Sequence, residues 1–241
     1  MSRTVQSVLD RYAEGVPYEQ LAVAFRKRRR WTGDDPRLLL AEAAASTTGQ
    51  RFLAGVKPTV ERFREAFVAT DRIESLADLA AVDPEDDTLV AAVGAQRKRR
   101  VLLEAAAALA TRPAADDRSA LIGWAETADH YRYDEDPIGS IAGVGPATFQ
   151  YLRQLAGVET IRADPTVVRL IDAVADDLES SPLDTASDLR TIASGEWLAL
   201  ESSYSALEID RLAWWTATDA DDRAAVLEVH GSPATAVTDC E

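Results

Sequence analysis

Helix-forming residues dominate this chain and strand-forming runs are nearly absent, which restricts the fold more than any other feature. The segment 101–110, VLLEAAAALA, combines high helix propensity with too little β-branching for a strand. Asp35-Pro36 is typical of an N-cap followed by the first helical residue, and Pro17 is suited to open a helix that reaches Trp31. We therefore predict an all-α fold.

Further helices follow at short intervals along the chain. The predicted segments are 57–69, 75–82, 84–93, 117–131, 165–178 and 205–218. Most are separated by short connections that contain Asp, Gly, Pro or Ser, and the last dozen residues are typical of a frayed tail. A chain of 241 residues can bury a full-sized core, either in one large domain or in two small lobes that share a cleft.

Cysteine and apolar runs restrict the cofactors and the compartment. Cys240 is the only cysteine in the sequence and lies one residue from its end. A single cysteine excludes an intrachain disulfide, a Cys-ligated zinc and an iron–sulfur cluster. No apolar run approaches the roughly 20 residues of a membrane helix, and the start MSRTVQSVLDRY lacks the apolar run of a signal peptide. We expect a cytoplasmic protein with no membrane contact.

The formal net charge is −15, and lysine occurs only as Lys27, Lys57 and Lys98. This combination is typical of a halophilic protein, whose acidic surface stays hydrated while molar salt screens its self-repulsion. We therefore do not take the acidity as an argument against nucleic acid. Two cationic runs stand out, 26–30 (RKRRR) and 97–100 (RKRR). Each could contact a duplex or form a helix face that pairs with nearby acids.

The most informative segment is 136–172, where a glycine turn joins two predicted helices. Gly143 and Gly145 suit positive φ and close backbone approach, and Pro146 fits the first turn of the next helix. The N–H groups of Gly145, Ala147 and Thr148 would then form an anion site suited to a DNA phosphate. An ordinary αα-corner with a glycine turn is the alternative. A dinucleotide site is disfavoured, because no strand precedes the turn and no third glycine follows it.

This segment resembles the helix-hairpin-helix of the endonuclease III-like DNA glycosylases, the HhH-GPD superfamily. The hairpin is centred on Gly143-Val144-Gly145. The segments 38–50 (LLLAEAAASTTGQ) and 93–106 (VGAQRKRRVLLEAA) are similar to an upstream helix with its loop and to the mid-domain loop and helix of that family. ADPTVVR at 163–169 falls where the family has its catalytic aspartate. The resemblance covers about 37–175.

The resemblance implies two helical lobes with a cleft between them. One lobe, 37–160, would be a helical barrel that ends in the hairpin, and the other would combine 1–36 with 161–241. Double-stranded DNA is the implied partner, and no obligate protein partner is implied. The implied DNA-binding residues are Gly143, Val144, Gly145, Ala147, Thr148, Arg97, Lys98, Arg99, Gln96 and Thr47, with Arg100 beside the duplex.

The implied catalyst is Asp164. A monofunctional glycosylase flips a nucleotide out of the duplex, and one carboxylate stabilises the oxocarbenium-like sugar while water attacks C1′. From the residues alone, Asp164 before Pro165-Thr166 is also a good helix N-cap. We expect monofunctional excision of a damaged or mismatched base, as in base excision repair. The alternatives are a catalytically inactive DNA-binding or damage-sensing relative, and a hairpin that mediates protein contact.

The chain departs from the family at several positions. Bifunctional members carry a lysine where this chain has Ala147, so Schiff-base chemistry and lyase activity are not expected. The iron–sulfur cysteines are also missing. The family's monovalent cation, K⁺ or Na⁺, would fall to the carbonyls of Gly139, Ile141 and Val144. The side chain that family members insert into the duplex as a wedge maps onto Thr47, Thr48 or Gln96.

The histidine and tryptophan residues are weaker candidates for a functional role. His130 and His230 have no metal-ligand partner at helical spacing, so solvated or packing roles are expected. Trp214 and Trp215 could stack on a base, or at least one could fill the core between the lobes. Trp31 could pack beside the DNA path or under the N-terminal helix.

The acidity predicts that the fold needs salt. The Debye length grows from about 3 Å at 1 M to about 10 Å at 0.1 M salt, so carboxylate repulsion then acts across the molecule. We expect the melting temperature to climb steeply between about 0.1 M and about 3 M KCl, measured by circular dichroism. A flat melting temperature over that range would contradict the halophilic interpretation.

Overall fold

The computed structural model describes the backbone of residues 4–231 and the side chains of 4–228, and every regular element in this range is helical. The all-α prediction is therefore confirmed for the described residues. No helix among them combines the length and apolarity needed to cross a membrane. His230 and Cys240 lie outside the described side chains.

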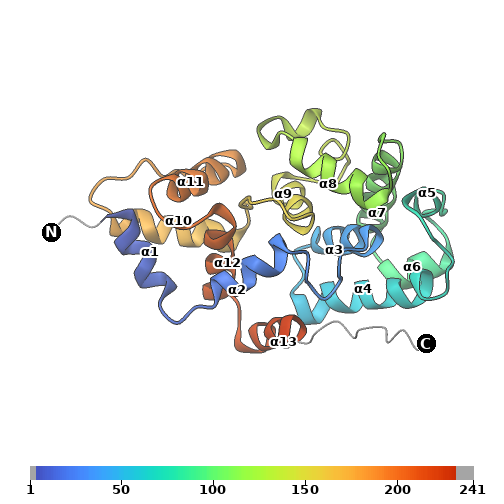
Figure 1. The fold of residues 1–241 in the computed structure, drawn as a ribbon, viewed down its shortest axis with the longest axis horizontal. Helices are drawn as coiled ribbons and strands as arrows, with labels where there is room; N and C mark the ends of the chain where they lie inside the picture. Colours follow the sequence, from blue (N-terminus) through green and yellow to red (C-terminus); the bar gives the residue numbers. More distant parts are fainter. Residues whose placement is uncertain (1–3, 232–241) are drawn as a thin grey trace.

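The helices follow one another with short connections, as Figure 1 shows. In chain order they are α1 (Val5–Ala13), α2 (Tyr18–Arg26), α3 (Pro36–Ser46), α4 (Lys57–Phe63), α5 (Leu76–Ala80), α6 (Asp87–Val93), α7 (Gln96–Ala110), α8 (Asp117–Thr127), α9 (Pro146–Leu155), α10 (Pro165–Asp177), α11 (Asp188–Leu200), α12 (Ala206–Ala217) and α13 (Ala220–Gly231). Two π-helical segments flank α4, η1 (Phe52–Val56) and η2 (Arg64–Val68), and η3 (His130–Glu135) is a 3₁₀ helix.

Side-chain caps fix many of the helix starts. Asp35 accepts from the amide of Arg37 at 2.9 Å, and Ser205 forms a reciprocal capping box with Glu208 at the start of α12. The helix predicted to reach Trp31 ends at Arg26 instead, because Arg28 adopts a positive φ of 50° that a right-handed helix cannot continue. The helices α1, α11 and α13 were not predicted.

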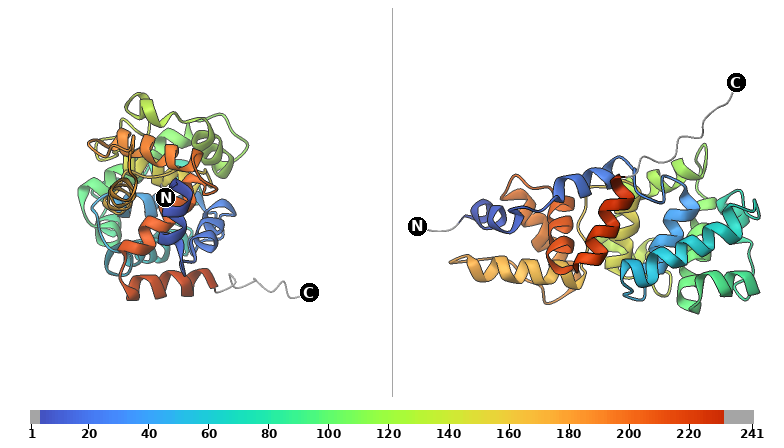
Figure 2. Two further views of the ribbon diagram at one scale, coloured as in Figure 1. Left: turned by 90° about the vertical axis from the view of Figure 1, so that its left-hand side faces the viewer. Right: turned by 90° about the horizontal axis from the view of Figure 1, so that it is seen from below.

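The buried apolar side chains form two clusters. The larger is built mainly from α3 to α9 and also includes Ala22, Phe25 and Leu207, whereas the smaller is built from α1, α10, α11 and α12. The molecule is elongated in Figure 1 and in the right panel of Figure 2, with an approximately round outline end-on. Phe25 and Leu207 come from segments assigned by sequence to the second lobe, so helices α2 and α12 also contribute to the first core.

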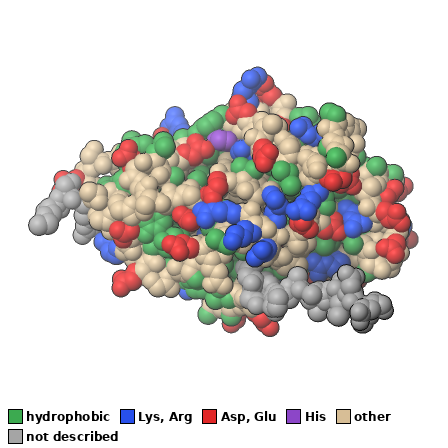
Figure 3. Space-filling model, viewed as in Figure 1, with side chains coloured by type: hydrophobic (Ala, Val, Ile, Leu, Met, Phe, Trp, Pro, Cys, Tyr) green, Lys and Arg blue, Asp and Glu red, His purple; other side chains and the backbone are tan. Residues whose placement is uncertain are grey.

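Charge is spread unevenly over the surface. Figure 3 shows acidic side chains over much of the visible face, while Lys and Arg gather near its middle. Several arginines are buried in the fold, among them Arg30, Arg99, Arg153 and Arg211. Each of these has a carboxylate, amide or carbonyl partner, so part of the chain's limited positive charge stabilises the interior.

Candidate functional site

A cleft of about 510 Å³ contains Asp164. Four segments form it: the loop between α3 and η1, the start of α9, the start of α10 and the end of α12 with the turn that follows. The side chains that matter most for its chemistry are Gln50, Arg51, Ala147, Thr148, Tyr151, Arg162, Asp164 and Trp214. The structure thus brings Ala147, Thr148 and Asp164, predicted from separate parts of the motif, into one cleft.

Asp164 is the N-cap of α10. Its Oδ1 accepts hydrogen bonds from the Thr166 amide at 2.9 Å, the Thr166 hydroxyl at 2.5 Å and the Val167 amide at 3.1 Å. Its Oδ2 pairs with the Arg162 guanidinium at 2.9 Å, and 18% of the side chain remains exposed. The aspartate therefore caps the helix and also presents a carboxylate to the cleft.

A buried carboxylate fixes the segment that leads into Asp164. Asp210, which has no exposed side-chain surface, accepts from the backbone N–H of Arg162 at 2.9 Å and from its guanidinium at 3.2 Å. Arg211 donates to the same carboxylate. Burial opposes the charge on Asp210, but Arg162 and Arg211 outweigh it and hold the pKa of Asp210 below its usual range. Burial lowers the pKa of Arg162, but the negative charges of Asp164 and Asp210 outweigh burial, so the pKa of Arg162 lies above its usual value.

A second buried pair lies on the other side of Tyr151. Glu42 is fully buried and accepts from Arg30, from the Tyr151 hydroxyl at 2.7 Å and from the Thr32 hydroxyl at 3.1 Å. Burial, together with the negative charge of Glu42, raises the pKa of Tyr151 to about 12. Tyr151 is therefore a neutral hydrogen-bond donor at physiological pH.

The hairpin turn uses its two glycines differently. Gly143 has a φ of 115°, and a Cβ there would lie 2.9 Å from Cγ of Arg97, so this position requires glycine. Gly145, expected to share a positive φ, instead has a φ of −118° and forms the N-cap of α9. A Cβ at Gly145 would meet no atom within 4 Å. The space in front of this residue is open.

Two helices begin without a side-chain cap close to this turn. Gly145 provides none for α9, where Pro146 occupies the first position and the amides of Ala147 and Thr148 fall in the first turn. Ala95 provides none for α7. The guanidinium of Arg97, in the first turn of α7, donates to the Gly143 carbonyl at 2.8 Å and so joins the two helix starts.

The structure divides the basic run 97–100 into inner and outer members. Arg97 and Arg100 are exposed. Lys98 is 3% exposed and donates to Gln50 at 2.7 Å, and Arg99 is 7% exposed and donates to backbone carbonyls and to Glu85. Their side chains are occupied within the fold, so a contact of Lys98 and Arg99 with a duplex is not supported.

The run 26–30 is also largely engaged internally. Arg26 pairs with Glu208 at 2.8 Å and with Glu159, and Arg30 pairs with Glu42. Arg28 donates to the Ala156 carbonyl at 3.3 Å. The alternative of pairing with nearby acids therefore describes Arg26 and Arg30.

The three predicted wedge residues differ in accessibility. The Thr47 side chain is buried and donates to the Ala44 carbonyl at 2.7 Å at the end of α3. Thr48 and Gln96 are exposed. A side chain inserted into a duplex must be accessible, so Thr48 and Gln96 remain predictions and Thr47 is the weakest of the three.

The predicted cation site lies in the same turn. The carbonyl of Ile141 accepts from the Val144 amide at 2.9 Å, and the Arg97 guanidinium already places positive charge against the turn. That charge opposes a further cation at the carbonyls of Gly139, Ile141 and Val144. Within residues 4–228 no group of three or more His, Cys, Asp or Glu side chains is arranged to hold a metal ion.

The aromatic and histidine candidates have defined positions. Trp214 lines the cleft, and Arg223 lies over the ring of its neighbour Trp215 at 5.2 Å. Trp31 packs against Phe52 with ring centroids 5.7 Å apart. His130 lies 3.0 Å from Glu196 and 3.1 Å from Arg153, which gives it a packing and bridging role between η3, α9 and α11.

Sequence reasoning missed several cleft residues. Arg162 could have been found, because it lies two positions before Asp164 and a cation next to a catalytic carboxylate affects its charge. Gln50, Arg51 and Tyr151 had no such signal, since they come from the loop after α3 and from α9. Only long-range packing brings them to the cleft.

No family model, curated protein or solved structure matches the chain.

Asp210→Asn is expected to destabilise the protein by about 3–5 kcal/mol, because it leaves the buried Arg211 guanidinium without its carboxylate and removes one of the two carboxylates that pair with Arg162. The matched control is Asp184→Asn, which neutralises an exposed carboxylate 2.7 Å from Arg190 and should cost less than about 1 kcal/mol. Urea unfolding in molar KCl measures both values. Equal effects of the two substitutions would show that the buried pair does not hold the structure.

Proposed function

We propose that this chain is a DNA-binding protein of the helix-hairpin-helix glycosylase type that hydrolyses the N-glycosidic bond of a damaged or mismatched base. The observation that carries the proposal is the single cleft that contains a partly exposed carboxylate, Asp164, the uncapped start of α9 and an aromatic side chain, Trp214. Phosphate binding, base extrusion and glycosidic hydrolysis need these three groups near one another.

The uncapped helix starts would hold the DNA backbone. The first-turn amides Ala147 and Thr148 lack intrahelical acceptors, and the helix dipole adds partial positive charge at that end. Arg97 adds a full charge beside the turn. Such groups bind phosphate irrespective of base sequence, which suits an enzyme that must scan a duplex.

Asp164 would act on the extruded nucleotide. Its negative charge stabilises the positive charge that develops on the sugar as the base departs, and its free lone pairs can orient the attacking water. The hydrogen bonds from Thr166 and Val167 hold the carboxylate in one rotamer, so little reorganisation is needed during the reaction. Ala147 occupies the position at which a lyase would need an amine, so the product is an intact abasic site.

One observation favours the second candidate, a DNA-binding protein without excision. Arg162 lies 2.9 Å from Asp164 and partly neutralises the carboxylate. The pair leaves the duplex-binding groups of α7 and α9 unaffected. Excision assays separate this candidate from the first.

DNA binding should depend on the start of α9. In Gly145→Asp the new carboxylate caps the helix but repels phosphate, whereas Gly145→Asn caps it without charge. Neither side chain meets a neighbour at Cβ, so both variants should fold. We expect Gly145→Asp to lose duplex affinity by at least about tenfold relative to Gly145→Asn, on every sequence tested, in a fluorescence anisotropy assay.

The double variant Arg97→Glu/Arg100→Glu reverses the two exposed charges of α7 and should weaken binding in the same sequence-independent way. Normal affinity in both Gly145→Asp and this double variant would show that the hairpin is not the DNA-binding element.

Asp164→Asn tests the catalyst, because asparagine caps a helix about as well as aspartate but carries no charge. Excision should fall by about 10²–10³-fold while duplex binding and stability persist. Asp116→Asn, the same change at the N-cap of α8 outside the cleft, should leave excision unchanged. The assay is the appearance of alkali-labile sites in lesion-containing duplexes.

Without alkali the strand should stay intact, and borohydride should trap no protein–DNA adduct. Full excision by Asp164→Asn would move the catalytic role to another residue, and an adduct lost in Lys98→Ala would identify a relocated amine.

A further inference from the structure

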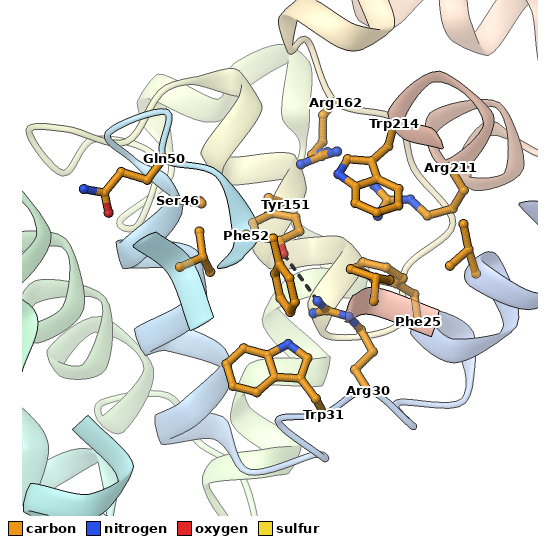
Figure 4. Close-up of a pocket in the computed structure, with 13 residues that line it drawn as sticks. Phe25, Arg30, Trp31, Ser46, Gln50, Phe52, Tyr151, Arg162, Arg211 and Trp214 are labelled. Carbon is orange, nitrogen blue, oxygen red and sulfur yellow. Dashed lines mark hydrogen bonds between the residues drawn. The ribbon is translucent and has the colours of Figure 1, made fainter. Parts of the chain in front are cut away.

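A second pocket continues the cleft into the interior. It encloses about 120 Å³ and shares Gln50, Phe52, Tyr151, Arg162 and Trp214 with the cleft. Figure 4 shows its aromatic walls, with Trp214 on one side and Phe52 and Trp31 on the other. Broad apolar ring surfaces on several sides select a flat, aromatic ligand. We call this space the donor pocket, because arginine and tryptophan side chains that donate hydrogen bonds line it.

Four buried nitrogens around the pocket lack a hydrogen-bond acceptor among the described residues. They are Nε and Nη1 of Arg30, Nε1 of Trp31 and Nε of Arg211. The side chains of Arg30 and Arg211 are each only 6% exposed. Figure 4 shows the Arg30 guanidinium directed towards Tyr151 and Phe52, with the indole nitrogen of Trp31 on the same side.

These donors are not satisfied by the aromatic contacts. The guanidinium carbons of Arg30 and Arg211 lie 4.2 Å and 4.5 Å from the centroid of Phe25, which engages the faces of the guanidinium groups and leaves N–H edges without acceptors. A buried donor without an acceptor destabilises the folded state. Four such donors on residues that line one pocket favour a ligand that brings acceptors.

The lining also determines the charge of that ligand. Arg30, Arg162 and Arg211 line the pocket, and its lining contains no Asp or Glu. Glu42 and Asp210, which pair with Arg30 and Arg211, are fully buried, and Arg162 also pairs with Asp164 in the adjoining cleft. Arginine and the tryptophan indole can only donate hydrogen bonds. The pocket therefore suits carbonyl oxygens and partial negative charge, and it opposes exocyclic amines and cationic rings.

We propose that the donor pocket receives a deaminated nucleobase, in which a ring carbonyl replaces the exocyclic amine: uracil, hypoxanthine or xanthine, and thymine in a mismatch with guanine. The proposal rests on the proposed function, because it supplies the substrate class of that same cleft. Adenine, cytosine and guanine would each point an amine donor at guanidinium donors. A purine that carries a positive charge after N-alkylation would face three arginines.

The pocket would also assist bond cleavage. Water forms a bond to C1′ as the C1′–N bond breaks, and the electron pair of that bond stays on the base, which leaves as an anion. The proton released by the water passes to Asp164 and then to solvent, and the base anion later takes a proton from solvent. Donors on Arg30 and Arg211 stabilise the negative charge that collects on the carbonyl oxygens.

The first test measures binding of free bases, independently of DNA. Quenching of tryptophan fluorescence reports on Trp31 and Trp214, which line the pocket. Uracil, hypoxanthine and xanthine should bind at least about tenfold more tightly than cytosine and adenine, as expected for hydrogen bonds to charged donors. Trp31→Phe keeps the ring and removes one donor, so it should reduce this preference. Equal affinity for oxo and amino bases would overturn the proposal.

A compensated variant provides the second measurement. Arg30→Met with Glu42→Gln removes the donors of Arg30 together with the charge it pairs, so no buried carboxylate is left alone. Circular dichroism checks whether the double variant folds. If the double variant unfolds, Trp31→Phe serves as the test variant. Loss of the preference for oxo bases in a folded variant supports the donor pocket, and an unchanged preference overturns it.

The third test uses duplexes, and its outcomes separate this proposal from the proposed function. Excision of uracil, hypoxanthine or xanthine, without release of 7-methylguanine or 3-methyladenine, supports both. Preferential excision of the alkylated purines over uracil, hypoxanthine and xanthine would overturn the proposed substrate class but would still support the glycosylase function. Selective binding of free oxo bases without any excision would support the pocket and overturn the catalytic function.

Discussion

The buried carboxylate of Asp210 is the constraint on which the cleft depends. It binds both the backbone and the side chain of Arg162, and Arg162 in turn contacts Asp164. These contacts hold the connection from α9 to α10 and set the direction in which Asp164 enters the cleft. Removing one partner of a buried ion pair is costly because it leaves an uncompensated charge, although the intact pair adds little net stability. The arrangement therefore fixes the position of Arg162 and Asp164 more than it stabilises the fold.

Local sequence predicted the helices well because their signals are local. Asp164 before Pro165 fixes the start of α10 through two backbone hydrogen bonds, and no distant residue is needed. The helix α11 was missed because its sequence, DLRTIASGEWLAL, mixes Thr, Ser and Gly with its apolar residues and gives a weak pattern. The burial of Lys98 depends on Gln50, which lies 48 positions away, so no local pattern could reveal it. The donor pocket is unpredictable for the same reason, since Arg30, Trp214 and Arg211 meet only after folding.

Net charge turned out to be a poor guide to the character of the site. The chain carries −15 overall, yet three guanidinium groups converge on one pocket whose lining contains no acidic side chain. Their compensating carboxylates, Glu42, Asp210 and Asp164, lie outside the pocket lining, so the pocket presents donors while the molecule as a whole stays acidic. A local field can therefore oppose the sign of the global charge, and functional arguments from total charge apply to the outer surface only.

The helix starts at Ala95 and Gly145 have no side-chain cap, and neither have those of α2 and α4, whereas many other helices are capped by Asp, Ser or Thr. A cap is worth about 1 kcal/mol, and the open space at Gly145 would accept one. Selection for thermostability alone would therefore favour a capping residue at this position. An aspartate there would place a carboxylate at the open end of α9. In such an experiment, improved robustness and loss of the anion-binding surface would arise from the same single change.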